Sequence, residues 1–215
     1  VVIIGAVIKL NAVLSETAKE FGVTRTEAAG IEVKLKLAQF NGLGLKLTSE
    51  EVRSSFTAIN ETLGGVNNAS VKLINQLANA AAISGTTAEE FSNILAIQES
   101  ISSSSREQLL AQTESLRATI RLEGVLPSSV FKDIAANTEA FAEFAKDGGK
   151  NVFDAATAAK KLGLNLSNVV SIADNLLDFE TSIEKQLEAS LLLGRDINLD
   201  KARELALNNN LKGAM

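Results

Sequence analysis

The residues in this chain whose spacing could support chemistry are carboxylates. Two pairs of adjacent acids, Glu50 with Glu51 and Glu89 with Glu90, could in principle serve acid–base or metal chemistry. Neighbouring residues on a helix point about 100° apart, so neither pair converges on one substrate. Acids in a first turn stabilise the positive end of the helix dipole. We therefore interpret both pairs as helix starts.

A second set of acids, Glu180, Glu184 and Glu188, shares one helix face. Carboxylate-bridged metal sites in helical bundles also need a Glu-x-x-His pattern on other helices, and the chain has no histidine. Calcium-binding loops and phosphate-binding glycine loops are absent as well. We interpret the three glutamates as a solvated stripe and predict no metal site and no cofactor.

The absence of both histidine and cysteine excludes whole classes of active site. It removes Ser/His and Cys/His nucleophiles and imidazole or thiolate metal ligands. No catalytic residue is predicted, and we expect a protein that is not an enzyme. Lys and Arg total 21 against 26 Asp and Glu, with the signs interspersed. That balance argues against a specific nucleic-acid ligand, which requires clustered cations.

The best candidate for a functional surface is an apolar stripe. It lies on a predicted amphipathic helix near 168–193, roughly 40 Å long at the helical rise. A stripe with near-heptad spacing can be buried within its own bundle, or it can pack against a partner or another copy. Packing within the chain is the simpler interpretation, and a partner face is the alternative. The residues of the stripe are Ile172, Leu176, Phe179, Ile183 and Leu187.

Helical periodicity dominates the rest of the chain. Val71, Ile74, Leu77 and Ala81 follow steps of three and four, and similar patterns recur after residues 108 and 151. The single proline, Pro127, leaves little to interrupt helices. We predict an all-α fold, a multi-helix bundle of short capped helices with one longer amphipathic helix.

One segment, Ile31–Leu37, alternates apolar and charged residues as a strand would. The segment continues into Ala38, Gln39 and Phe40 and has no obvious partner strand, and an isolated strand is not stable. We predict a helix here.

Helix starts and stops are marked locally. Capping boxes are predicted where a hydroxyl residue precedes an acid by three positions, and Pro127 begins a further helix. Glycines mark the helix ends. The predicted boxes are Thr48 with Glu51, Thr87 with Glu90, and Ser104 with Glu107. The predicted stops are Gly22, Gly44, Gly65, Gly85, Gly124, Gly148, Gly149, Gly163 and Gly194.

The first four stops are about 20 residues apart, which leaves a helical solenoid open as an alternative. The serine run Ser102–Ser105 resembles a hinge, and we place a domain boundary there, giving regions 1–103 and 104–215. At the N-terminus, Val1–Ile8 is apolar but far shorter than the roughly 20 residues that span a bilayer. We favour a buried helix end over a truncated membrane span or signal remnant, so membrane contact there is an open but unsupported alternative.

Residues 159–210 resemble a stretch of bacteriophage tail tape measure proteins. The likeness is carried by AKKLGL at 159–164, DFETSIE at 178–184 and LLGRDINLDKAR at 192–203. The preceding part matches that family only in style, with Ala- and Ser-rich capped helices and few aromatics.

The resemblance implies a structural virion protein, made in the host cytoplasm, that occupies the lumen of the tail tube. Such a protein helps to set tail length and leaves with the DNA at infection. Implied partners are tail tube and baseplate proteins, a tail assembly chaperone and other copies of the chain. Tape measure proteins are longer than this sequence, which implies a fragment, and the frequent turns favour a folded region over the measuring rod. The alternative is a free-standing helical adaptor or solenoid that mediates protein–protein interaction.

Overall fold

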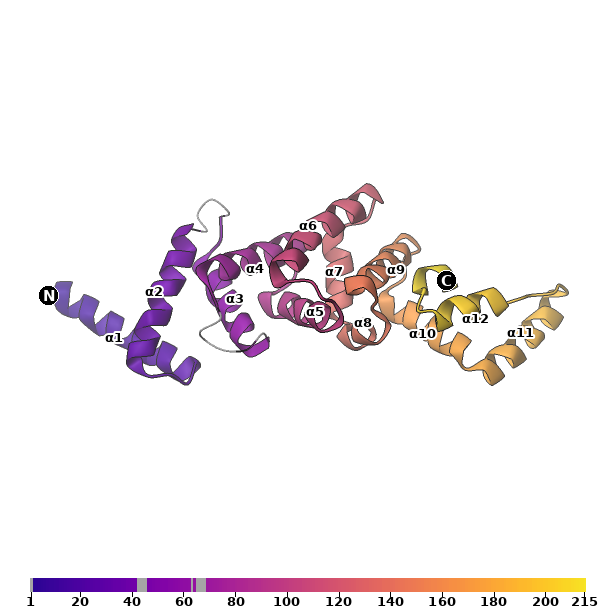
Figure 1. Cartoon of the computed structure of the whole chain (residues 1–215), viewed down its shortest axis with the longest axis horizontal. Coiled ribbons are helices and arrows are strands. Elements are labelled where there is room, and N and C mark those ends of the chain that lie inside the picture. Colours follow the sequence, from indigo (N-terminus) through magenta and orange to yellow (C-terminus); the bar gives the residue numbers. More distant parts are fainter. Residues whose placement is uncertain (1, 42–45, 63, 65–68) are drawn as a thin grey trace. The chain divides into compact units, whose positions relative to one another are not determined.

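The computed structural model describes residues 2–41, 46–62, 64 and 69–215. Within these ranges the regular elements are all helices, and no strand occurs, so the predicted all-α multi-helix fold is confirmed (Figure 1). The first five helices are α1 (Val2–Glu20), α2 (Arg25–Asn41), α3 (Ser49–Thr62), α4 (Val71–Ser84) and α5 (Ala88–Ile101). They are followed by α6 (Arg106–Leu122), α7 (Pro127–Ala135), α8 (Thr138–Phe144), the short 3-10 helix η2 (Asp147–Gly149), α9 (Lys150–Lys161), α10 (Leu166–Leu177), α11 (Phe179–Leu193), α12 (Asp200–Leu207) and α13 (Leu211–Ala214).

The chain divides into two compact units, Val1–Asn79 and Ala80–Met215. The division falls inside α4 rather than at Ser102–Ser105, where the sequence placed the boundary between 1–103 and 104–215. The serine run joins α5 to α6, and both of these helices belong to the second unit. A run of small polar residues therefore marks a helix-to-helix turn here and not a boundary between units.

In the first unit, α2 packs against both α1 and α3. The end of α1 is fixed by Phe21, whose ring meets the buried ring of Phe56 edge-on at 5.1 Å between centroids. Arg53 of α3 binds carboxylates on both neighbours, Glu20 at the end of α1 and Glu32 of α2. This unit is thus held together by a small apolar core and by the ion pairs of Arg53.

The segment Ile31–Leu37 lies inside α2, so the prediction of a helix is confirmed. Ile31 and Leu35 are buried, whereas Val33 and Leu37 are 57% and 50% exposed. Residues two apart on a helix point about 200° apart, so the strand-like alternation gives α2 an apolar residue on each of two opposite sides.

The apolar N-terminal segment falls at the start of α1, apart from Val1, which lies outside the described residues. No helix in the described part of the chain is long and apolar enough to cross a membrane.

The second unit is built around four phenylalanines. Phe131 of α7 stacks on Phe91 of α5 and contacts Phe153 of α9 at 5.0 Å, and Phe153 meets Phe141 of α8 edge-on at 5.9 Å. All four side chains are buried. Each such ring pair contributes about 0.5–1.5 kcal/mol beyond the burial of its area. The core therefore rests on aromatic residues to a greater extent than the composition suggested.

A close approach at Gly149 completes this core. Gly149 adopts a φ of 87°, and a Cβ placed on it would lie 2.3 Å from Cζ of Phe141. The preceding residue, Gly148, accepts a hydrogen bond through its carbonyl from Nε2 of the buried Gln98, at 2.8 Å. Only glycine provides both the conformation and the space at position 149.

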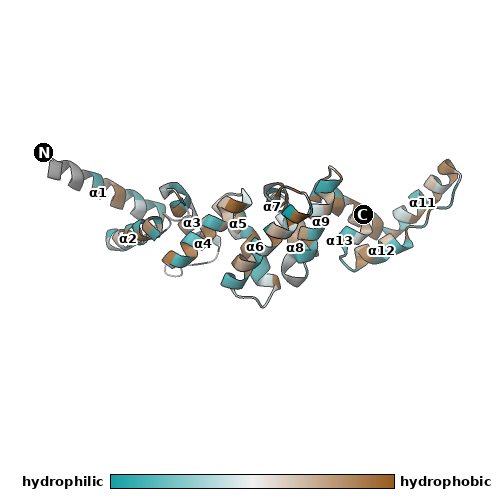
Figure 2. Ribbon diagram, turned by 90° about the horizontal axis from the view of Figure 1, so that it is seen from above, coloured by the Kyte–Doolittle hydropathy of each residue, from teal (hydrophilic) through white to brown (hydrophobic). Residues whose placement is uncertain are grey.

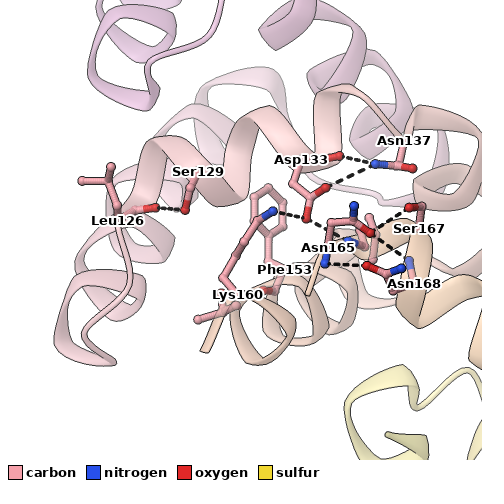
Figure 3. A network of polar contacts seen from close by, with 11 residues as sticks. Leu126, Ser129, Asp133, Asn137, Phe153, Lys160, Asn165, Ser167 and Asn168 are labelled. Atoms are coloured by element: carbon pink, nitrogen blue, oxygen red, sulfur yellow. Dashed lines mark hydrogen bonds and ion pairs between the residues drawn. The ribbon is translucent and has the colours of Figure 1, made fainter. Parts of the chain in front are cut away.

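A buried carboxylate joins α7, α9 and α10 (Figure 3). One oxygen of Asp133, Oδ2, accepts the backbone N–H of Leu166 at 2.8 Å and lies 3.0 Å from Nζ of Lys160. The N-cap residue Asn165 and Asn168 form a reciprocal capping box at the same helix start. Asp133 thus fixes the position of α10, the helix that precedes α11.

Most of the predicted helix boundaries agree with the structure. The boxes Thr48 with Glu51 and Thr87 with Glu90 are present, and Pro127 begins α7. The box predicted at Ser104 with Glu107 is wrong by one residue, because Ser105 and Gln108 form it instead. The predicted glycine stops that follow a helix end with a positive φ are Gly22, Gly85, Gly124, Gly163 and Gly194. Gly148 and Gly149 also have a positive φ, but they lie in η2 at the start of α9, so the prediction of a helix stop there is wrong. Gly44 and Gly65 lie outside the described residues.

Candidate interaction surface on helix α11

The predicted long helix at 168–193 is divided into two helices at Asp178, so that prediction is wrong. Asp178 has non-helical backbone angles (φ −75°, ψ 83°), and its Oδ1 accepts the N–H of Thr181 at 3.4 Å. An aspartate that caps a new first turn competes with continuation of the preceding helix. The chain therefore changes direction between Leu177 and Phe179.

The side of α11 that faces its own unit is polar. Ser182, Gln186 and Ser190 recur at steps of four and meet the segment that returns toward α12. Oε1 of Gln186 accepts the N–H of Leu199 at 3.2 Å, and Oγ of Ser190 accepts the N–H of Ile197 at 3.1 Å. Hydrogen bonds thus hold the returning segment to this side.

The third of these contacts involves a buried arginine. Nε of Arg203 donates to Oγ of Ser182 at 2.9 Å, and Nη1 donates to Oδ1 of Asp200 at 3.0 Å. Arg203 is 4% exposed, and its Nη2 has no hydrogen-bond partner among the described residues. Burial of an arginine is costly unless its N–H groups are hydrogen-bonded. The bond to Arg203 therefore holds Ser182 on the inner side of α11.

The row of residues next to this polar series is apolar and exposed. Within α11 only Ser182 is buried. We call Phe179, Ile183, Leu187 and Leu191 the α11 ridge, since they follow one another at steps of four. Their exposures are 44%, 46%, 58% and 84%. Leu192 and Leu193 are also exposed, and the hydrophobic colour at the C-terminal end of α11 is visible in Figure 2.

A groove begins at the C-terminal end of the ridge. It has a volume of about 600 Å³ and opens widely to the surface. Its lining residues are Leu187, Ser190, Leu191, Gly194, Arg195 and Asp196. The ridge and the groove together form a contiguous apolar surface, and surfaces of this kind mark interaction sites more often than isolated exposed leucines do.

The structure separates the predicted stripe into two parts. Leu176 is 7% exposed and packs within the unit, whereas Phe179, Ile183 and Leu187 lie on the exposed ridge, and Ile172 on α10 is 37% exposed. Packing within the chain, which the sequence favoured, therefore holds for Leu176 and is wrong for the three α11 residues.

Leu191, Leu192 and Leu193 belong to the same surface but were missed. The signal that could have found the exposed side is the polar series Ser182, Gln186 and Ser190, which has the same spacing as the ridge. Such a polar row can face the inside of the unit when the chain folds back beside it and its backbone N–H groups donate hydrogen bonds to the polar side chains.

The acidic residues that the sequence singled out occupy exposed positions or helix starts. Glu50 and Glu51 lie in the first turn of α3, and Glu89 and Glu90 lie in the first turn of α5. Glu180, Glu184 and Glu188 are exposed on α11. Among the described residues, no three acidic side chains gather closely enough to hold a metal ion.

No protein-family model, no curated protein and no solved structure matches this chain.

Proposed function

We propose that this chain is a folded helical part of a bacteriophage tail tape measure protein, with a structural role and no catalysis. In this proposal the α11 ridge is the surface through which the chain contacts other virion proteins in the tail. The observation that carries the proposal is the orientation of α11, which bonds its polar side inward and leaves its apolar side exposed.

The location of the ridge supports this proposal. The stretch that resembles tape measure proteins, residues 159–210, runs from the end of α9 to just past α12 and includes all of α11. Two of the three resembling segments, 178–184 and 192–203, supply residues of the ridge or of the returning segment that orients it. The resemblance and the exposed surface thus coincide in one part of the chain.

The energetics favour a partner over solvent. Burying a leucine, isoleucine or phenylalanine side chain fully stabilises a complex by roughly 1.5–3 kcal/mol before association costs. The ridge offers four such side chains on one face of a helix that is anchored by hydrogen bonds. A preformed surface of this kind loses little conformational freedom on binding.

The second candidate is a free-standing helical adaptor that binds a protein partner. It is favoured by the closed phenylalanine core of the second unit, which could support an independent domain. Both candidates use the same ridge, but they differ in the assembly that contains it.

The deciding experiment is mass spectrometry of purified virions from the phage that encodes the chain, combined with the paired substitution Ile183→Asp and Leu187→Asp. We expect the chain's peptides in wild-type tails, and aberrant tail length or lost assembly in the variant. Lys185→Gln, an exposed position on the same helix about 200° away from Ile183 and Leu187, is the matched control and should leave the tails unchanged. Absence of the chain from virions would remove the tape measure proposal and leave the adaptor.

A further inference from the structure

A second exposed apolar face exists on α2, in the other unit. Val33, Leu37 and Phe40 follow the spacing i, i+4, i+7, and they are 57%, 50% and 71% exposed. We call these three residues the α2 outer face. It lies on the side of the helix opposite the buried residues Ala28, Ile31, Leu35 and Ala38. A surface helix needs only one apolar side for its own core, so this second side is available for a partner.

The α2 outer face is bordered by positive charge. Lys34 and Lys36 are adjacent in sequence to Val33 and Leu37, and neither forms an ion pair within the described part of the chain. The two acids of α2 are already engaged: Glu27 accepts hydrogen bonds from Thr24, and Glu32 binds Arg53. The outer face therefore presents apolar side chains beside free cations.

The α11 ridge is bordered by the opposite charge. Glu180, Glu184 and Glu188 each follow a ridge residue directly, and all three are exposed and without ion pairs among the described residues. The single cation of α11, Lys185, is two residues from both Ile183 and Leu187, which places it about 200° away from the ridge. Along α11 the ridge therefore presents apolar side chains beside free carboxylates, and Arg195 and Asp196 lie together in the groove at its C-terminal end.

We propose that the α2 outer face of one copy of the chain packs against the α11 ridge of another copy. Both faces contain apolar residues at steps of three or four, and rows of this kind fit into the grooves between rows on a facing helix. Lys34 and Lys36 would then approach the row of glutamates. This inference rests on the proposed role of the α11 ridge as a contact surface and names its occupant.

The charges beside the two faces favour contact between an α2 outer face and an α11 ridge over contact between two identical faces. Two α11 ridges brought together would oppose glutamates with glutamates, and two α2 outer faces would oppose lysines with lysines. Only the mixed pairing brings opposite charges together. Such a contact uses different surfaces on the two copies, so it is heterologous and either closes into a ring or extends into a chain.

The test uses the full chain and two paired variants in sedimentation velocity over a concentration series. One variant carries Val33→Asp with Leu37→Asp, and the other carries Ile183→Asp with Leu187→Asp. All four positions are exposed, so unchanged circular dichroism and thermal unfolding should show that both variants fold. The matched control is Leu122→Asp with Leu126→Asp, which charges two exposed leucines outside both faces.

We expect the wild-type chain and the control to associate beyond dimers as concentration rises, and each paired variant alone to remain monomeric. An equimolar mixture of the two variants should form one-to-one dimers that do not grow, because only one intact contact remains. Replacing Lys34 and Lys36 with glutamate should weaken association, and a partner chain with Glu180→Lys and Glu184→Lys should restore it.

Several results would overturn the inference. Dimers of the Val33→Asp, Leu37→Asp variant alone would indicate contact between two α11 ridges, and dimers of the other variant would indicate contact between two α2 faces. A wild-type chain that stays monomeric would mean that the faces are covered by another protein or within the chain. If such a monomeric chain still needed the ridge in virions, the proposed function would stand and this inference would fail.

Discussion

Nε of Arg203 donates a hydrogen bond to Oγ of Ser182 across 2.9 Å, in a position where both residues are buried. This contact joins α12 to α11 and fixes which side of α11 faces inward. Ile183 follows Ser182 directly, about 100° further around the helix, so the ridge runs beside the inner row and remains exposed. A polar contact thus determines the exposure of an apolar surface.

Loss of this contact should destabilise the second unit. Ser182→Ala removes the acceptor for Nε of Arg203, whose Nη2 already lacks a partner, and a buried donor left unpaired costs about 1–3 kcal/mol. The measurement is the free energy of unfolding from urea denaturation. Ser171→Ala, at an exposed position on α10, is the control and should change the free energy by less than about 0.5 kcal/mol. Equal effects of both substitutions would contradict the role of the contact.

The two parts of the predicted stripe should respond differently to a charge. Leu176→Asp would bury an unpaired carboxylate and should lower the free energy of unfolding by about 3–5 kcal/mol. Ile183→Asp places the same carboxylate at a position that is 46% exposed and should cost less than about 1 kcal/mol in the monomer. Thermal unfolding at low protein concentration distinguishes the two. A large loss of stability with Ile183→Asp would show that the ridge is internal.

The glycine beside Phe141 should be intolerant of any side chain. Gly149→Ala combines a positive φ with a Cβ that would lie 2.3 Å from Cζ of Phe141, and we expect a loss of about 3–5 kcal/mol from strain and overpacking together. Gly163→Ala is the matched control, because Gly163 also has a positive φ but open space around it, and about 1–2 kcal/mol is expected. Comparable losses at both sites would exclude a contribution from the Phe141 contact.

The charge of the Asp133 carboxylate and its role as a hydrogen-bond acceptor should each contribute to the stability of the second unit. Asp133→Ala leaves the N–H of Leu166 and the ammonium of Lys160 without their partner, and about 2–4 kcal/mol is expected. Asp133→Asn keeps an acceptor for Leu166 and should lose less. Glu204→Ala breaks an exposed ion pair with Lys201 and should cost under about 1 kcal/mol. Urea denaturation of the three variants gives the order of their free energies of unfolding. An unchanged free energy in the Asp133→Ala variant would contradict the prediction.

Helix type and most helix ends could be predicted because their causes are local. The side chains of Thr87 and Glu90 each accept the other's backbone N–H within four residues, and Pro127 needs only its own ring geometry to begin α7. The box near Ser104 failed by one residue because a run of serines offers several equivalent caps, and Gln108 rather than Glu107 completed the one that forms.

The orientation of α11 could not be predicted, because its cause is not local. Periodicity identifies a polar row and an apolar row, but it does not say which row faces the protein. The choice is made by Arg203, Leu199 and Ile197, which donate to the polar row from 7 to 21 positions further along the chain. The break at Asp178 was missed because an aspartate inside a long apolar pattern is compatible with a continuous helix until it caps a new one.

The exposed side of α2 also could not be predicted from its strand-like pattern alone. The segment Ile31–Leu37 was correctly predicted to be a helix, but the exposure of Val33 and Leu37 was not predicted. In a helix that alternation requires two apolar sides, and only one of them is covered within the unit.

The absence of cysteine from the chain permits a direct test of the central claim, that the α11 ridge is an exposed contact surface. Leu187→Cys and, as a buried reference, Leu176→Cys are labelled with a maleimide in the dilute chain and again in the assembled state. We predict rapid labelling of Cys at position 187 in the dilute chain, strong protection on assembly, and slow labelling at position 176 in both states. Slow labelling at position 187 in the dilute chain, or equally fast labelling after assembly, would contradict the account.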